Sequence, residues 1–177
     1  HPMYRRQRQM CIRDRSDFLS LFGNVFEKTE SVAVEAFESK PFKNFEDIMF
    51  KMLDIYENYE KNKVLEILNA HPELAVAKKM TSESISEQAS AKLNQCSNDE
   101  YEEFKKLNSE YKKKFNFPFI IAVKGKDKNE ILNNFRQRIQ SDVESEFLEA
   151  KKQVKKIATF RSVSYTHLTL PTIHRVE

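Results

Sequence analysis

Only two glycines, Gly23 and Gly125, occur in the 177 residues, and this scarcity constrains the fold more than any other feature of the sequence. Tight β-hairpins and glycine-rich phosphate loops both need glycine, because their backbones pass through conformations that other residues disfavour. The chain therefore lacks the material for a hairpin-rich β-protein or a nucleotide-binding loop. We expect a fold built from helices.

Hydrophobic periodicity supports this expectation. The first apolar set follows the i, i+3, i+4, i+7, i+8 spacing of one helix face and consists of Phe18, Leu21, Phe22, Val25 and Phe26. Further apolar sets at helical spacing lie at 49–56, 64–68, 85–93, 101–111, 131–139 and 147–158. The sequence therefore predicts an all-α, single-domain helical bundle.

One stretch does not fit a helix. The sequence FNFPFIIAV at 115–123 is dense in aromatic and β-branched residues and is interrupted by Pro118. Its periodicity does not distinguish a strand from a buried turn, and helices on both sides leave a strand no partner. We expect an extended segment near residues 115–123 that crosses the core, followed by a polar turn at Gly125.

The two ends of the sequence are related as sense and antisense. One choice of codons for MCIRD at 10–14 has a reverse complement that reads VSYTH, the sequence at 163–167. In the same way RRQRQ at 5–9 gives LTLPT at 168–172. Such an inverted pair resembles adapter sequence translated as though it were coding. We therefore predict non-native flanks at 1–15 and 163–177 around one native domain at 16–162.

Removing the flanks changes the charge and the cysteine count. Residues 1–15 carry five arginines and one aspartate, and residues 163–177 carry one arginine and one glutamate, which leaves 24 basic and 25 acidic side chains. A net charge of about −1 gives no reason to expect a nucleic acid partner, and no apolar run is long enough to suggest a membrane span. Cys96 is then the only cysteine, so we expect a reducing compartment without disulfides.

His71 is the only histidine within 16–162. It precedes Pro72, which disfavours helical dihedrals in the residue before it and so ends a helix there. An imidazole held at a helix end can project into a cleft and transfer protons near neutral pH. The alternative is a helix-terminal histidine that interacts only with the last carbonyls and the helix dipole.

Two other groups of polar residues are candidates for chemistry. Ser84, Glu87 and Gln88 share one helix face beside the apolar set 85–93, which would bring a hydroxyl, a carboxylate and an amide to the edge of the core. Ser84 and Glu87 also fit the spacing of a capping box. Arg161 continues the apolar stripe of the last predicted helix, where it could hold a carboxylate bidentately or extend toward solvent.

Four stretches, taken together and in this order, resemble the 2-oxo-4-hydroxy-4-carboxy-5-ureidoimidazoline (OHCU) decarboxylase family of urate degradation: AHPELA (70–75), SESISEQASAKL (82–93), LNSEYKKKFNFPFIIAV (107–123) and QVKKIATFR (153–161). The likeness spans 18–161. It implies an all-α carboxy-lyase that uses no cofactor or metal, is usually a homodimer, and converts a small anionic ureidoimidazoline to (S)-allantoin. The expected compartment is the cytoplasm, or the peroxisome in a eukaryote.

The resemblance also implies roles for individual residues. It gives His71 and Glu87 as the catalytic groups. It gives the following substrate-binding residues: Pro72, Ser84, Gln88, Phe119, Ile121, Ala122 and Arg161. The chain departs from the family pattern at Glu73, where the family prefers aspartate, and at 90–92, where the family has small residues. Glu73 should not affect the site if it faces outward, and we expect Lys92 to be the change that bears most on the pocket.

Two alternatives remain open. In a non-catalytic helical interaction domain, His71, Glu87 and Arg161 need not converge, and the first two could lie more than about 8 Å apart without a shared cavity. In a decarboxylase of the same fold with another substrate, the site would act on a different ureido acid.

Overall fold

The computed structural model describes residues 14–75 and 81–173, and every regular element within these ranges is helical. The elements are α1 (Arg15–Phe22), α2 (Ser31–Glu38), α3 (Phe45–Glu57), α4 (Lys61–Ala70), α5 (Ser82–Ser90), the 3-10 turn η1 (Leu93–Gln95), α6 (Asn98–Phe115), α7 (Lys128–Arg138) and α8 (Val143–Ile173). The predicted all-α class is confirmed.

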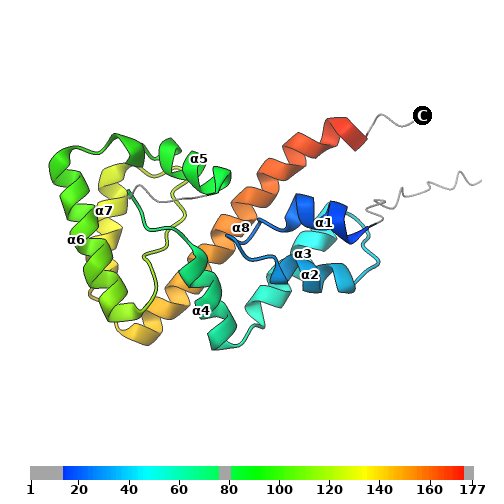
Figure 1. Ribbon diagram of the computed structural model, residues 1–177, viewed down its shortest axis with the longest axis horizontal. Helices are drawn as coiled ribbons and strands as arrows, with labels where there is room; N and C mark the ends of the chain where they lie inside the picture. The colour runs from blue at the N-terminus through cyan, green and yellow to red at the C-terminus, as the bar shows by residue number, and fades with distance from the viewer. Residues whose placement is uncertain (1–13, 76–80, 174–177) are drawn as a thin grey trace, which may run out of the picture.

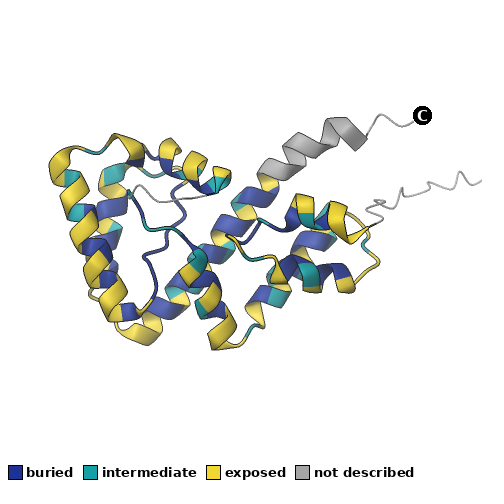
Figure 2. Ribbon diagram, viewed as in Figure 1, coloured by how far each residue is buried: buried dark blue, intermediate teal, exposed yellow. Residues whose placement is uncertain are grey.

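Helix α8 is the central support of the fold. It runs diagonally through the molecule, with α5, α6 and α7 on one side and α1, α2 and α3 on the other (Figure 1). Helices α3, α4 and α6 all pack against it, and its buried face lies between the two groups (Figure 2). The predicted domain boundary between residues 162 and 163 falls inside α8, and it stays a prediction.

The predicted extended segment is confirmed, although α6 includes Phe115 and the segment begins one residue later. Asn116 caps the end of α6 with a left-handed φ of 64°, which turns the chain out of the helix. Residues 117–123 then run without regular structure and are all buried (Figure 2). Phe119 stacks on Phe135 of α7 with ring centroids 3.9 Å apart. The turn that follows uses Gly125 at a φ of 77°, where an L-residue would be strained.

A buried ion pair holds this segment from the other side. Arg138 at the end of α7 donates from Nε to Glu146 Oε1 on α8 (3.0 Å) and from Nη1 to the carbonyl of Ile120 (2.8 Å). The Tyr111 hydroxyl donates to the same Glu146 oxygen. Because Arg138 contacts the backbone of Ile120 directly, this network holds the extended segment against α7 and α8.

Replacing Glu146 should destabilise the fold strongly. Glu146→Gln removes the charge that compensates buried Arg138, and a buried charge left without its partner costs about 3–5 kcal/mol. Urea unfolding of the variant and the parent protein measures this difference. Glu144→Gln is the matched control, because Glu144 also pairs with a cation, Lys61, but both side chains are more than half exposed. Its cost should stay below about 1 kcal/mol, and equal costs for the two variants would contradict the assigned role.

Two details of the predicted helices are wrong. The first apolar set does not form one helix, because α1 ends at Phe22 and Val25 and Phe26 are buried in the connection to α2. A Cβ on Gly23 would lie 2.5 Å from the carbonyl oxygen of Leu19, so the end of α1 suits glycine. Helix α2 itself was not among the predicted elements.

The orientation of α5 is also opposite to the prediction. Ile85 is 52% exposed and Ala89 is exposed, whereas Ser84 and Gln88 are buried. Helix α5 therefore turns its polar face toward the interior. Such an orientation is stable only when the buried polar groups find hydrogen-bond partners inside the protein.

Candidate active site

His71 is the residue that ends α4. Its extended backbone (φ −70°, ψ 142°) is the conformation that Pro72 favours in the preceding residue. The ring Nδ1 lies 2.8 Å from the carbonyl oxygen of Ile67. Because a carbonyl only accepts, Nδ1 carries the proton and Nε2 presents its lone pair. The side chain thus interacts with one of the last carbonyls of α4, as expected for a helix-terminal histidine. It also lines a cavity.

The loop after His71 is fastened by two amide side chains. Gln88 accepts from the Ala75 backbone N–H (3.1 Å) and donates to the carbonyl of Glu73 (3.2 Å). Asn108 on α6 donates to the carbonyl of Leu74 (3.0 Å). Gln88 was predicted to bind substrate, and the structure adds that it holds the loop that carries the histidine.

Ser84 does not cap α5. The N-cap is Thr81, whose hydroxyl accepts from the Ser84 backbone N–H, so the capping-box alternative is wrong. The Ser84 hydroxyl instead donates to Glu27 Oε2 at 2.6 Å. The inward polar face of α5 therefore meets a carboxylate from the connection between α1 and α2.

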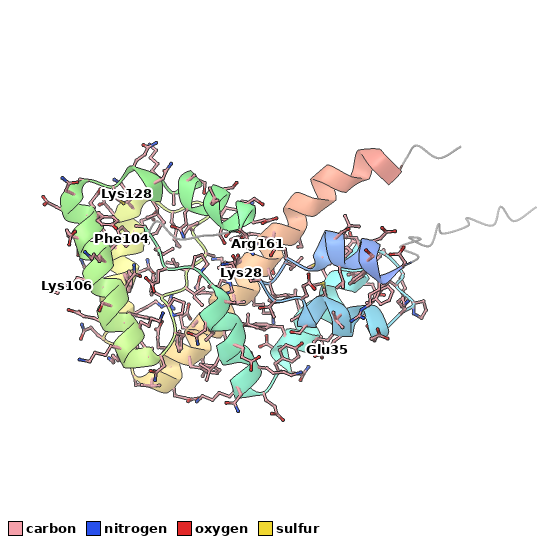
Figure 3. The ribbon with its side chains drawn as sticks, viewed as in Figure 1. Lys28, Glu35, Phe104, Lys106, Lys128 and Arg161 are labelled. Carbon is pink, nitrogen blue, oxygen red and sulfur yellow. The ribbon has the colours of Figure 1, made fainter. Side chains whose placement is uncertain are left out.

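Arg161 does not extend toward solvent. It is 5% exposed and lies at the centre of the molecule, beside the connection between α1 and α2 (Figure 3). Its Nε and Nη2 donate to the two oxygens of Glu87 at 2.7 and 3.0 Å, a bidentate pair. Nη2 also donates to Glu27 Oε2 at 3.0 Å and to the Ser84 hydroxyl at 3.1 Å. One guanidinium thus joins α5, α8 and the α1–α2 connection.

Sequence reasoning missed Glu27. This residue is fully buried, and its Oε2 accepts from Thr81 (3.0 Å) as well as from Ser84 and Arg161. A signal was present in the sequence, because Glu27 directly follows the apolar pair Val25 and Phe26. A charge at the end of an apolar run is weak evidence, however, when its partners are not known.

All the predicted site residues line one or the other of two adjoining cavities. A small one of about 30 Å³ is lined by His71, Pro72, Ser84, Glu87, Gln88, Phe119 and Ile121. A larger groove of about 430 Å³ is lined by Glu87, Ala122 and Arg161, together with residues that include Ser82 and Lys124. Glu87, Val123 and Ile157 line both. Glu87 therefore belongs to the wall between the two cavities.

The departures from the family pattern lie at different distances from the cavities, and Ser90 lines the larger groove. Lys92 is exposed, has a left-handed φ of 57° and lines neither cavity. Glu73 forms an ion pair with Lys112 at 3.5 Å, and its side chain is only 17% exposed, so the condition that it faces outward is not met.

Burial controls the protonation of the site. Desolvation lowers the pKa of His71 to about 4, although the Ile67 carbonyl and the charge of Glu27 act in the opposite direction. Burial alone would raise the pKa of Glu27, but the Ser84 hydroxyl and the charge of Arg161 outweigh it and hold this pKa below its ordinary value. Near neutral pH the histidine is therefore neutral and Glu27 is a carboxylate.

The buried histidine should make stability depend on pH. Unfolded His71 takes up its proton near pH 6.5, whereas the folded state resists protonation until about pH 4, so the unfolded state binds more protons between these values. Stability is then lost as the pH falls through this window, by about 2–3 kcal/mol from this group. Urea unfolding at about pH 7 and about pH 4.5 measures the loss. Between these two pH values the His71→Asn variant should lose about 2–3 kcal/mol less unfolding free energy than the parent protein. Equal losses in the two proteins would contradict the effect of burial on His71.

The described ranges contain neither a cluster of metal-ligating side chains nor a membrane-spanning helix. No three histidine, cysteine, aspartate or glutamate side chains within them are grouped so as to hold a metal ion. None of the helices within them is long and apolar enough to cross a membrane.

The chain is similar to proteins of one known family. The family described as OHCU decarboxylase matches residues 13–162. The uric acid degradation bifunctional protein of Bacillus sp. (strain TB-90) is 38% identical over 156 residues, which cover 88% of this chain and 31% of that protein. The OHCU decarboxylase of Haloferax volcanii is 35% identical over 148 residues, which cover 84% of this chain and 88% of that protein.

A solved structure shows the same fold. It is described as the crystal structure of OHCU decarboxylase in the presence of (S)-allantoin, and it is similar with a TM-score of 0.68 at 24% identity. The match covers 85% of this chain and 97% of the other. At this identity the likeness establishes the arrangement of helices.

Proposed function

This chain belongs to the OHCU decarboxylase family, and we propose that it removes CO2 from OHCU to form (S)-allantoin. One observation carries the proposal. His71, Glu87 and Arg161 come from α4, α5 and α8, yet the first two line one cavity and the last two form a bidentate pair. A neutral base, a carboxylate and an arginine thus line two adjoining cavities that share Glu87.

The reaction is balanced by one proton. The hydroxyl and carboxyl groups of OHCU share ring carbon 4, so the ring double bond joins carbon 5 to nitrogen. When the bond to the carboxylate breaks, the electron pair moves toward carbon 5 and that nitrogen, and CO2 leaves. The hydroxyl then loses its proton to become the ring carbonyl. Protonation of nitrogen and of one face of carbon 5 gives allantoin, with one proton taken up overall from the carboxylate form.

His71 is the proposed carrier of these protons. Its Nδ1 proton is held by the Ile67 carbonyl, and burial keeps the ring neutral, so Nε2 is a base. In the proposed reaction Nε2 accepts the proton of the substrate hydroxyl and returns a proton to carbon 5. General acid–base catalysis of this kind typically contributes about 10²–10⁴-fold in rate.

Arg161 is the proposed anchor for the anionic substrate. Its guanidinium matches a carboxylate in shape and charge, but Glu87 occupies that edge in the structure. The small cavity has room for one or two water molecules at about 30 Å³, so it does not admit OHCU. Displacement of Glu87 by the substrate would join this cavity to the groove and free the Glu87 carboxylate to bind the ureido group or to orient the imidazole.

Release of CO2 tests the proposed reaction. OHCU can be generated in situ from urate by urate oxidase and hydroxyisourate hydrolase, and CO2 is then followed with and without this protein. We expect release far faster than the spontaneous decay. A folded sample that gives only the spontaneous rate would contradict the proposal.

The competing proposals predict different behaviour. A non-catalytic interaction domain gives no reason for His71 and Glu87 to line one cavity, which they do. A decarboxylase for another ureido acid would leave OHCU unchanged but release CO2 from that acid. Assaying a panel of ureido acids beside OHCU distinguishes this second case.

Assembly and location are also part of the proposal. The family resemblance supports a homodimer, and exposed apolar side chains such as Phe50 (69% exposed) and Leu148 (57% exposed) are candidates for a dimer interface. Sedimentation equilibrium measures the mass in solution. A reducing compartment, the cytoplasm or the peroxisome, suits a domain in which Cys96 is free, and cell fractionation tests it.

A further inference from the structure

Arg161 has two carboxylate partners whose surroundings differ. The Glu27 side chain is fully buried, and the Glu87 side chain is 30% exposed. Glu27 lies next to Phe26, whose ring packs against Tyr56 at a centroid distance of 4.9 Å. The backbone that carries Glu27 is therefore anchored in the core.

The hydrogen bonds of Glu27 also fix its position. Its Oε2 accepts from Thr81, Ser84 and Arg161, whereas its Oε1 is buried without a hydrogen-bond partner among the described residues. A buried carboxylate in this state depends strongly on the neighbouring cation. Movement of Glu27 away from Arg161 would leave both charges uncompensated in the interior.

Glu87 is free to move by comparison. It borders the large groove, so its carboxylate can turn toward solvent without loss of hydration. An incoming carboxylate brings a further negative charge to a site that already holds two, and Arg161 cannot bind all three equally. The more exposed of the two resident carboxylates is the one that gives way.

We propose that Glu27 is a positioning residue, the fixed counterion that holds the Arg161 guanidinium in place while the substrate carboxylate displaces Glu87. This proposal rests on the proposed function. Without Glu27, Glu87 would be the only resident counterion of Arg161, and the substrate would have to compete against a tighter pair. The guanidinium would also lose its ion pair with the α1–α2 connection.

Steady-state kinetics of Glu27→Gln give the first test. We expect KM for OHCU to rise by about tenfold or more, because the substrate displaces a stronger internal pair, while kcat falls by less than about threefold. Glu27→Asp keeps the charge at a shorter reach and should recover part of the loss. If Glu27→Gln does not fold, Glu27→Asp still decides, with a raised KM expected and an unchanged KM contradicting the proposal.

A double-mutant cycle separates positioning from a general structural effect. If Glu27 acts through Arg161, Glu27→Gln should change KM by less than about twofold when Arg161→Gln is already present. A carboxylate that only supports the fold would give the same factor in both backgrounds. Glu35→Gln is the control, because Glu35 is an exposed carboxylate of α2 paired with Lys63, and it should leave KM unchanged.

Nuclear magnetic resonance gives a readout that needs no activity. The Nη protons of Arg161, assigned by their loss in Arg161→Lys, should give separate signals while the guanidinium is held. These signals should persist in Glu87→Gln and merge in Glu27→Gln; the reverse result would overturn the proposal. If the parent protein does not decarboxylate OHCU, the proposed function fails, and this measurement still decides whether Glu27 positions Arg161.

Discussion

His71→Asn is expected to lower kcat for OHCU decarboxylation by about 10²–10⁴-fold, with a small change in KM. Asparagine keeps a polar side chain at the end of α4 and can still donate to the Ile67 carbonyl, which the histidine contacts at 2.8 Å. It cannot accept and return a proton near neutral pH. The loss should therefore fall on the chemical step, and single-turnover kinetics measure it.

The controls for His71→Asn separate chemistry from folding. Far-UV circular dichroism should be unchanged, and the variant should unfold cooperatively in urea. Because the buried imidazole is already neutral near neutral pH, its replacement leaves no buried charge without a partner. A folded variant that keeps kcat within about threefold of the parent would contradict a proton-transfer role.

Arg161→Gln is expected to lose both stability and activity. It leaves Glu27 and Glu87 without the cation that joins them, and removing one partner of a buried ion pair costs about 3–5 kcal/mol. It also removes the proposed substrate anchor, so kcat/KM should fall by about 10³-fold or more. Urea unfolding and steady-state kinetics at about pH 7 measure the two effects.

The control for this variant is another arginine with the same kind of partner. Arg136 forms a bidentate pair with Glu103, but its side chain is 51% exposed. Arg136→Gln should cost less than about 1 kcal/mol and leave kcat/KM unchanged. Lowering the pH should also narrow the stability gap between Arg161→Gln and the parent, because Glu27, whose pKa the charge of Arg161 helps to lower, takes up a proton more readily without that charge. Similar costs for the two arginine variants would contradict the buried network.

The sequence predicts the fold well where local signals are strong. Spacing of apolar residues places α3, α4, α6, α7 and α8, and Pro118 with its aromatic neighbours predicts the extended segment. Helix α2 was not predicted, because its eight residues are fewer than the window of about 11–18 residues over which helical periodicity is read. The orientation of α5 was predicted wrongly, since its polar face turns inward only because distant groups supply partners for Ser84 and Gln88.

The candidate site shows the same division between local and distant information. His71 is predictable because Pro72 fixes the helix end beside it in sequence. Glu27 is not, because its hydrogen-bond partners Thr81, Ser84 and Arg161 lie 54, 57 and 134 residues away. Periodicity places a residue on a face of its own helix and says nothing of which other segments meet that face. The resemblance to a family carried the remaining assignments.

The most direct test of the central claim follows the handedness of the product. Purified protein is supplied with OHCU generated in situ from urate, and circular dichroism records optically active allantoin with the parent and with His71→Asn. We predict rapid appearance of (S)-allantoin with the parent and loss of that signal in the variant. Racemic allantoin at the spontaneous rate from the folded parent would contradict the claim that this site decarboxylates OHCU and protonates one face of its product.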